Sequence, residues 1–297
     1  MKKTGMIYIL LVVFMFIVPI SVIARDVSPI VTTAWLESNL NNPKVVILDV
    51  RKVEDYKAGH IPGAVNVFYG SWVVTRDGSR NEVPLSDDLF DTIGSAGIGP
   101  DSIVVVVSKV DAMGDRTDGT RVAWTLKYAG VENVALLDGG YNKWVSDKKA
   151  LSTDMVKPKP TTYKGKISEN LFANKAYVLS HVGKALVIDG REPDFYLGKN
   201  KLDFVAKAGH VAGAVNLPTS QVFTQEGTYK DKAALEAMAT AVVGKDTSRE
   251  IITYCDSGKV ATVWAFVLSE VLGFKNVKDY DGSMEEWSKD PAAPVEQ

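Results

Sequence analysis

The chain has 297 residues, of which 46% are hydrophobic and 24% are charged. This composition is typical of globular proteins and argues against large-scale disorder, and the length suggests about two domains. The formal net charge of −2 gives no electrostatic reason to expect a nucleic-acid partner, since such proteins usually carry a concentrated basic surface.

The N-terminus has the pattern of a secretory signal peptide. Two lysines precede an apolar stretch, Met6–Val18, which is followed by Pro19 and by Val22-Ile23-Ala24. We expect residues 1–24 to be removed after Ala24, and the mature protein to be periplasmic or secreted. The alternative is an uncleaved anchor helix, because the apolar stretch nearly reaches the roughly 20 residues that a bilayer requires. Pro19 and the Val-Ile-Ala ending favour cleavage, so contact with a membrane is expected only through this segment.

Short apolar runs alternate with helical patterns in the chain that follows. The apolar runs show no polar alternation, which indicates a parallel sheet covered by helices on both faces and therefore the α/β class. Ser86 and Gly130 are candidate cap residues. In chain order the expected elements are a strand at Val45–Leu48, a helix at Leu85–Ala96, a strand at Ile103–Val107, a helix at Thr120–Ala129 and a strand at Val134–Leu137.

The chain contains one unit twice. The segment VVILDVRKVEDYKAGHIPGAVNV begins at Val45, and its counterpart LVIDGREPDFYLGKNKLDFVAKAGHVAGAVNLP begins at Leu186. Both contain Gly-His-x-x-Gly-Ala-Val-Asn near their ends. A second pair, VENVALLDGGYNKW from Val131 and FKNVKDYDGSMEEW from Phe274, ends in tryptophan in both copies. A repeat of about 130 residues is too long for a solenoid and indicates a duplicated domain.

A segment rich in proline and lysine, KPKPTTYKGK, separates the two copies. It offers little to bury and is predicted to be a semi-stiff linker, residues 157–166. The domains are therefore expected at residues 26–156 and 167–294.

The only cysteine, Cys255, follows an apolar run, Ile251–Tyr254, that is expected to be a buried strand. A short loop and a predicted helix, Val260–Leu272, come next. Reactive groups of parallel sheets lie at the carboxyl ends of strands. Backbone N–H groups of the loop and the helix dipole would stabilise a thiolate there and lower the thiol pKa. A lone cysteine has no intramolecular disulfide partner, so an inert buried thiol and a reactive nucleophile both remain open.

One residue argues against a cysteine phosphatase. That chemistry requires an arginine six positions after the cysteine, which grips the phosphoryl oxygens through two hydrogen bonds. Ala261 occupies this position.

Several motifs occur in a characteristic order along the chain. These are the tandem Gly-His-x-x-Gly-Ala-Val-Asn segments, a Cys-x-Ser-Gly-x-x-Ala loop in the second copy alone, and Tyr-Asp-Gly-Ser-x-x-x-Trp near the C-terminus. Over roughly Asp26–Pro291 the chain resembles the two-domain rhodanese family of sulfurtransferases. The resemblance implies two rhodanese folds, each a parallel five-stranded sheet with helices on both faces. It also implies a catalytically silent first domain, where Ser108 occupies the strand end.

The reaction implied by the resemblance is covalent sulfur transfer. The Cys255 thiolate would take a sulfur atom from an anionic donor such as thiosulfate or 3-mercaptopyruvate and pass it, as a persulfide, to cyanide or a thiol. No metal or organic cofactor is required. The expected substrate-binding residues are Arg191 and the loop residues Asp256, Ser257, Gly258, Lys259, Val260 and Ala261, whose backbone amides would stabilise the thiolate and the persulfide.

The loop departs from the thiosulfate-using pattern at Asp256, whose carboxylate opposes thiolate formation unless it points away, and Lys259 partly compensates. In relatives that use 3-mercaptopyruvate, a serine two residues after the cysteine relays to first-domain residues. Here that relay would consist of Ser257, His60 and Asp49.

Two features keep other interpretations open. His60 has a repeat counterpart, His210, so both histidines could simply fix a turn. Phe195 stands where the family usually has a second donor-binding arginine. Together with Asp256, this departure keeps a carrier of persulfide or another chalcogen, without rapid turnover, as the alternative function.

Overall fold

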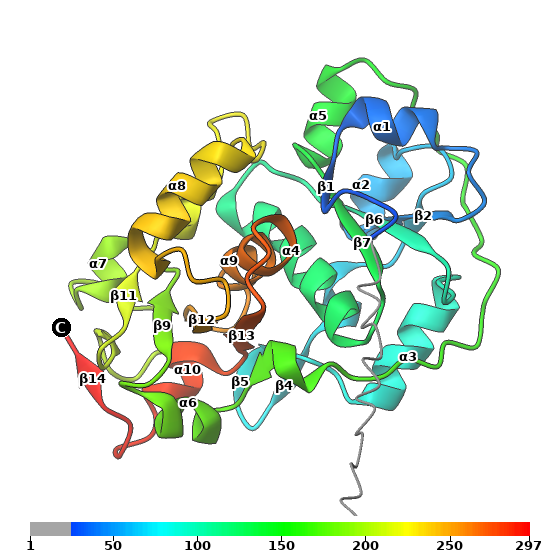
Figure 1. Ribbon diagram of the computed structural model, residues 1–297. Helices are drawn as coiled ribbons and strands as arrows, with labels where there is room; N and C mark the ends of the chain where they lie inside the picture. The colour runs from blue at the N-terminus through cyan, green and yellow to red at the C-terminus, as the bar shows by residue number, and fades with distance from the viewer. Residues whose placement is uncertain (1–24) are drawn as a thin grey trace, which may run out of the picture.

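The structure, a computed structural model, describes residues 25–297 and contains two five-stranded sheets (Figure 1). The predicted signal peptide, residues 1–24, lies outside the described residues. Within the described part of the chain, no helix combines the length and the apolar character that crossing a membrane requires.

The first sheet has the strand order β1-β7-β6-β2-β3, and all its neighbouring strands are parallel. Side chains alternate between the two faces of a strand, so successive residues of β6 are buried in different hydrophobic cores. Val104 and Val106 belong to the core on one face, and Val105 and Val107 belong to the core on the opposite face. The strands are β1 (Ile30–Val31), β2 (Val45–Asp49), β3 (Val65–Asn66), β6 (Ile103–Val107) and β7 (Asn133–Leu137). One face is covered by α1 (Thr33–Ser38), α2 (Val53–Ala58) and α5 (Gly140–Ser146), the other by α3 (Ser86–Ser95) and α4 (Met113–Tyr128).

The second sheet repeats this arrangement in the order β11-β9-β12-β13-β8, again with parallel neighbours. The duplication and the predicted α/β architecture are thus confirmed. The strands are β8 (Phe172–Ala173), β9 (Leu186–Asp189), β11 (Val215–Asn216), β12 (Glu250–Tyr254) and β13 (Asn276–Tyr280). The helices are α6 (Lys175–His181) and α10 (Ser283–Trp287) on one face and α8 (Lys232–Val243) and α9 (Thr262–Phe266) on the other, with a short α7 (Pro193–Tyr196) beside them.

Two small elements complete the domains. In the first domain, a 3-10 turn η1 (Tyr69–Trp72) leads into an antiparallel hairpin of β4 (Val74–Arg76) and β5 (Ser79–Glu82), which lies beside α10 of the second domain (Figure 1). In the second domain, β10 (His210–Val211) pairs antiparallel with β14 (Val295–Glu296) near the C-terminus.

The predicted helix at Thr120–Ala129 begins too late, because α4 already starts at Met113. Gly114, Asp115 and Gly119 make the missing part resemble a loop. Buried residues follow one another from Gly119 to Leu126, so this helix shows no amphipathic pattern. The reason is its position between the two domains, where other elements surround it.

Two further details of the predicted helices are wrong. Ser86 is the first residue of α3 and not its cap, and Leu85 at the cap position makes no side-chain cap bond. The helix expected at Val260–Leu272 starts at Thr262 and changes into a π-helical turn at Val267–Val271.

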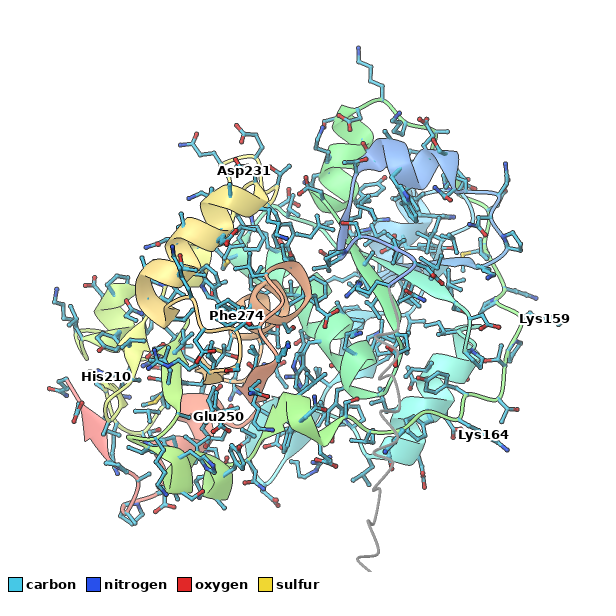
Figure 2. All side chains as sticks on the ribbon, viewed as in Figure 1. Lys159, Lys164, His210, Asp231, Glu250 and Phe274 are labelled. Carbon is cyan, nitrogen blue, oxygen red and sulfur yellow. The ribbon has the colours of Figure 1, made fainter. Side chains whose placement is uncertain are left out.

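The segment predicted to be a linker, residues 157–166, contains no helix or strand and lies along the outer side of the first domain, where Lys159 and Lys164 are labelled in Figure 2. It is fastened there by hydrogen bonds. Thr161 N–H donates to the Gly94 carbonyl at 2.9 Å, and Tyr163 OH donates to the Ala129 carbonyl at 3.0 Å.

The two domains share a hydrophobic core where α4 packs against α9 (Figure 1). Val83 and Trp124 of the first domain belong to the cluster that surrounds Trp264 in the second. Phe266 of α9 is buried in turn among first-domain residues such as Val122. Because each domain completes the other's core, we expect them to unfold together.

Phe266→Ala tests this shared core. Removing a buried phenylalanine from a packed interior should lower the free energy of unfolding by about 3–5 kcal/mol. Urea unfolding followed by circular dichroism and by tryptophan fluorescence should show one coincident transition before the substitution. Leu85→Ala is the control, because Leu85 is 65% exposed, and its effect should stay within about 0.5 kcal/mol. An unchanged midpoint for Phe266→Ala would contradict the shared core.

Candidate active site

Cys255 lies directly after the central strand β12, at the carboxyl end of the second sheet. Its side chain is 2% exposed. Its backbone N–H donates to Ser283 Oγ at 3.0 Å, and its carbonyl accepts from the Met284 N–H at 3.1 Å. The first turn of α10 therefore fixes the start of the segment that we call the cysteine loop, residues 255–261.

The Ser283 hydroxyl closes the cysteine loop. Ser283 Oγ accepts hydrogen bonds from the N–H groups of Cys255 and Gly258, both at 3.0 Å, and donates to the Tyr280 carbonyl at 2.9 Å. It also lies 3.9 Å from Cys255 Sγ. Ser283 has a φ of 47°, a costly conformation for a residue with a Cβ. Sequence reasoning gave Ser283 no role, although the first copy has Gly140 at the matching position, a difference that could have identified it.

Gly258 requires the conformational freedom of glycine. Its φ is +68°, and a Cβ added there would collide with the Asp281 carbonyl oxygen. The Gly258 carbonyl accepts from Arg121 Nη1 at 2.6 Å. The middle of the cysteine loop is thus fixed from two sides, by Ser283 within the second domain and by Arg121 from the first.

Arg121 of α4 is the main first-domain residue in the site. Its side chain is fully buried, and Nη1 also forms an ion pair with Asp281. The other carboxylate oxygen of Asp281 accepts from the Val83 N–H at 2.8 Å. Sequence reasoning missed Arg121, because its partners belong to the other copy and no local pattern connects them.

The hairpin of the first domain supplies a second contact. Asn81 Nδ2 donates to Ser257 Oγ at 3.0 Å, and Asn81 Oδ1 accepts from Tyr69 OH at 3.0 Å. Asn81 has a φ of 59°, a strained conformation that recurs at functional sites. The Asp77-Gly78 pair in the sequence is a turn signal, but it does not reveal where the hairpin docks.

Arg191, expected to bind the donor, is committed to other partners. Its guanidinium forms a bidentate pair with Asp189 and donates to the Gly209 carbonyl at 2.7 Å. Only Nη1 faces the cysteine loop, where it lies 3.2 Å from Asp256 Oδ1. Arg191 therefore partly offsets the negative charge of Asp256, the carboxylate that the sequence placed beside the cysteine. The lysines of the neighbouring insertion do not replace it, since Lys207, for example, donates to the Asp290 carbonyl.

The structure does not assemble the relay of Asp49, His60 and Ser257. Asp49 pairs with Arg51. The His60 ring is fully buried, with Nδ1 2.8 Å from the Tyr56 carbonyl and Nε2 3.1 Å from the Asp154 carbonyl. Its repeat counterpart His210 likewise contacts the carbonyl of Tyr196 at 2.8 Å. Both histidines thus fix the turn that follows a short helix, and neither ring nitrogen of His60 is available to Ser257.

Burial raises the pKa of the Cys255 thiol, and the carboxylates of Asp256 and Asp279 raise it further. Hydrogen bonding from the backbone of Ala261 and Ser257 acts in the opposite direction. The predicted lowering of this pKa is therefore wrong. Backbone N–H groups do stabilise a thiolate at this position, but the free energy lost by removing the thiolate from water is larger than this stabilisation.

Asp279, at the end of β13, is completely buried near Cys255. Burial raises its pKa to about 8; Asp281 adds to the rise, and Arg121 opposes it. Asp279 Oδ1 accepts from Thr253 Oγ1 at 2.8 Å. Asp279 is therefore more readily protonated than an exposed carboxyl group, and in its charged form it opposes thiolate formation on Cys255.

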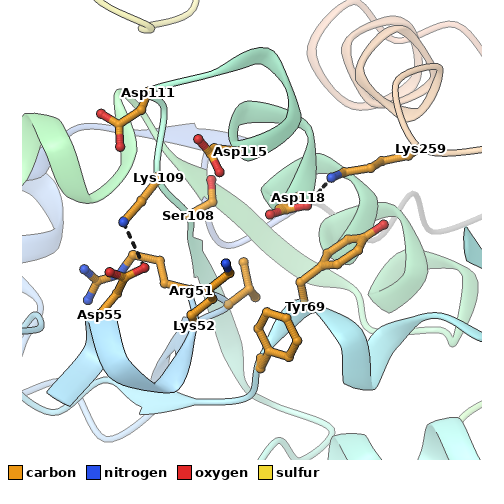
Figure 3. A pocket seen from close by; sticks show the side chains of 12 residues that line it. Arg51, Lys52, Asp55, Tyr69, Ser108, Lys109, Asp111, Asp115, Asp118 and Lys259 are labelled. Carbon is orange, nitrogen blue, oxygen red and sulfur yellow. Dashed lines mark ion pairs between the residues drawn. The ribbon is translucent and has the colours of Figure 1, made fainter.

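A cavity of about 290 Å³ opens at the carboxyl edge of the first sheet (Figure 3). Ser108 lies at its wall, and Lys259 of the cysteine loop reaches it from the second domain. Lys259 forms an ion pair with Asp118 of α4, and its ammonium group lies 4.6 Å from the centre of the Tyr69 ring. Burial raises the pKa of Asp118, and Lys259 lowers it.

The remaining residues of the cysteine loop, Val260 and Ala261, contribute a backbone hydrogen bond and a buried side chain. The Val260 carbonyl accepts from Thr219 Oγ1 at 3.3 Å, and Ala261 is fully buried. The cysteine loop, residues 255–261, is therefore one closed unit, and of the other predicted site residues only Arg191 touches it. Across residues 25–297 no group of three or more His, Cys, Asp or Glu side chains is arranged to hold a metal ion.

The rhodanese-like domain model matches residues 32–147 and again residues 173–290. The chain therefore belongs to the rhodanese family, as a tandem of two rhodanese-like domains. It is 33% identical over 275 residues to a Mycolicibacterium smegmatis protein named "Putative thiosulfate sulfurtransferase", a match that covers 90% of this chain and 97% of the relative. It is 30% identical over 284 residues to the sulfur carrier protein TtuD of Thermus thermophilus, a match that covers 90% of this chain and 95% of that relative.

Solved structures agree on the fold. The anaerobic ergothioneine biosynthesis enzyme of Chlorobium limicola, solved in complex with trimethyl histidine, superposes with a TM-score of 0.78 at 20% identity. The match covers 91% of this chain and 70% of that enzyme. Family membership and the names of the relatives support sulfurtransferase activity.

The pH dependence of alkylation tests the raised pKa. Because thiolate is the reactive form, labelling of Cys255 by iodoacetamide should be slow at neutral pH and should still be rising above pH 9. Asp256→Asn removes a charge that raises the pKa and should shift the curve to lower pH. Asp194→Asn, on the exposed face of the same domain, is the matched control and should leave it unchanged. A plateau below pH 7 would contradict burial as the dominant effect.

Proposed function

We propose that this protein is an exported sulfurtransferase that moves a sulfane sulfur from thiosulfate or 3-mercaptopyruvate to cyanide or a thiol through a persulfide on Cys255. The observation that carries the proposal is the closed cysteine loop at a strand end, held by Ser283 from its own domain and by Arg121 from the other. The family membership and the relatives' names give the class of reaction.

The chemistry balances without a cofactor. With thiosulfate, the Cys255 thiolate attacks the outer sulfur, a new S–S bond forms, and the S–S bond of the donor breaks as sulfite leaves with the electron pair. A cyanide ion or thiolate then attacks the terminal sulfur of the persulfide, and the Cys255 thiolate is released. The loop amides that oppose the rise in the thiol pKa are placed to stabilise the anionic sulfur in both steps.

The side chains in and around the cysteine loop have separate roles in this reaction. Arg191 holds the Asp256 carboxylate, which would otherwise repel an anionic donor. Asn81 fixes the Ser257 hydroxyl. Lys259 is the one cationic side chain of the cysteine loop and supplies attraction for the donor.

A persulfide carrier is the second candidate, and burial favours it. A thiol that is 2% exposed and has a raised pKa reacts slowly with molecules in solution. This property suits storage of a persulfide for a partner protein. The Thermus relative bears the name of a sulfur carrier.

Persulfide formation and turnover separate these candidates. Incubation with thiosulfate or 3-mercaptopyruvate should add about 32 Da, the mass of one sulfur atom, at Cys255 and nowhere else. Adding cyanide should give repeated turnover, measured as thiocyanate, and Cys255→Ser should abolish both. One sulfur per chain without cycling would establish the carrier, and no adduct at all would refute both functions.

Export is part of the proposal and has its own measurement. The sequence of residues 1–24 supports removal after Ala24. The intact mass of the protein recovered from cells should correspond to a chain that begins at Arg25, found outside the cytoplasm. A full-length mass in the membrane fraction would instead indicate a retained anchor.

A further inference from the structure

Lys259 is already bound before a donor arrives. Its ammonium group forms an ion pair with Asp118 and lies against the Tyr69 ring, and both partners belong to the first domain (Figure 3). The side chains of Lys259 and Asp118 are only 20% and 23% exposed, so water screens the pair incompletely. Among the described residues, Lys259 is the only cation within ion-pair distance of Asp118.

The cations nearest to Lys259 are occupied as well. Arg121 is bound to Asp281 and Arg191 to Asp189. At the cavity wall, Lys109 pairs with Asp55 at 2.8 Å. Lys52 also lines the cavity. Among the described residues, however, the cations that contact the cysteine loop itself are paired, so an anionic donor that binds Lys259 must withdraw it from Asp118.

Asp118 and an anionic donor compete for the ammonium group of Lys259. If the donor takes Lys259, the half-buried Asp118 carboxylate loses its partner and also faces the incoming anion. Asp118 thus reduces the attraction of the donor to Lys259 and adds a repulsion of its own. Both effects scale with the charge of the donor, so each is twice as large for a dianion as for a monoanion. Thiosulfate is a dianion at neutral pH, whereas 3-mercaptopyruvate, with its thiol protonated, is a monoanion.

We infer that Asp118 is a specificity-determining residue, which by occupying Lys259 selects singly charged sulfur donors over doubly charged ones. The inference rests on the proposed function and specifies its substrate class. It concerns a residue of the silent domain, which thereby acts on donor choice as well as on the position of the loop.

The experiment compares kcat/KM for thiosulfate and for 3-mercaptopyruvate, with cyanide as the acceptor. Asp118→Asn should raise the thiosulfate value about fivefold more than the 3-mercaptopyruvate value. In the Lys259→Gln background the same substitution should change the ratio less, because no cation is released. Asp118→Ser provides the same test with a smaller side chain.

Asp111→Asn is the matched control. Asp111 lines the same cavity and carries the same charge, but its carboxylate accepts from Asn142 and does not contact Lys259. It should change the donor ratio less than twofold. An equal shift for both substitutions would mean that general cavity charge, and not the pair with Lys259, sets the preference, and would overturn the inference.

Protection by sulfate gives a readout that needs no turnover. Sulfate, a dianion that cannot donate sulfur, should slow alkylation of Cys255 at lower concentration in Asp118→Asn than in the unaltered protein. An unchanged donor ratio and unchanged sulfate protection, while Cys255 still forms its persulfide, would overturn this inference alone. If neither donor loads Cys255 in the unaltered protein, the proposed function fails, and the inference fails with it.

Discussion

The pairing of Arg121 with Asp281 is the constraint on which the rest of this structure depends. A guanidinium with no exposed surface is stable only where a carboxylate compensates it, and removing either partner would leave an isolated buried charge. The same Arg121 nitrogen also holds the Gly258 carbonyl, so the ion pair between domains and the shape of the cysteine loop cannot be separated. The domain without a cysteine thus supplies a buried charge and a hairpin that contact the cysteine loop of the other domain.

Burial of Cys255 follows from the same arrangement. The hairpin and α4 of the first domain close over the loop, and the cost of removing a thiolate from water then exceeds the stabilisation by backbone groups. The sequence revealed the loop, the helix and Asp256, which are local features, whereas the extent of desolvation depends on how distant parts of the chain pack around the loop.

The fold could be predicted because the sequence contains the same strand and helix patterns twice. The place of the cysteine could be predicted because Cys255 directly follows a strand. Apolar runs on both faces of the strands indicated the parallel sheets, and the position of Cys255 after Ile251–Tyr254 indicated its place at their carboxyl edge. The start of α4 was missed, because a helix buried on all sides loses the periodicity on which such predictions depend. Arg121 and Asn81 were missed for a different reason: their partners lie in the other copy, and one sequence without an alignment contains no signal for contacts between copies.

The two copies use the same Asp-x-Arg pair in different ways. In both, the arginine is held by the aspartate and by a glycine carbonyl, Gly59 in the first copy and Gly209 in the second. The guanidinium of Arg51 lies 3.5 Å from the centre of the Tyr141 ring, whereas that of Arg191 faces Asp256. The shared contacts therefore maintain the turn after the strand, and only the remaining nitrogen is free to specialise. In the second copy this nitrogen offsets the carboxylate next to Cys255, so a residue that fixes the turn also affects the charge beside the cysteine.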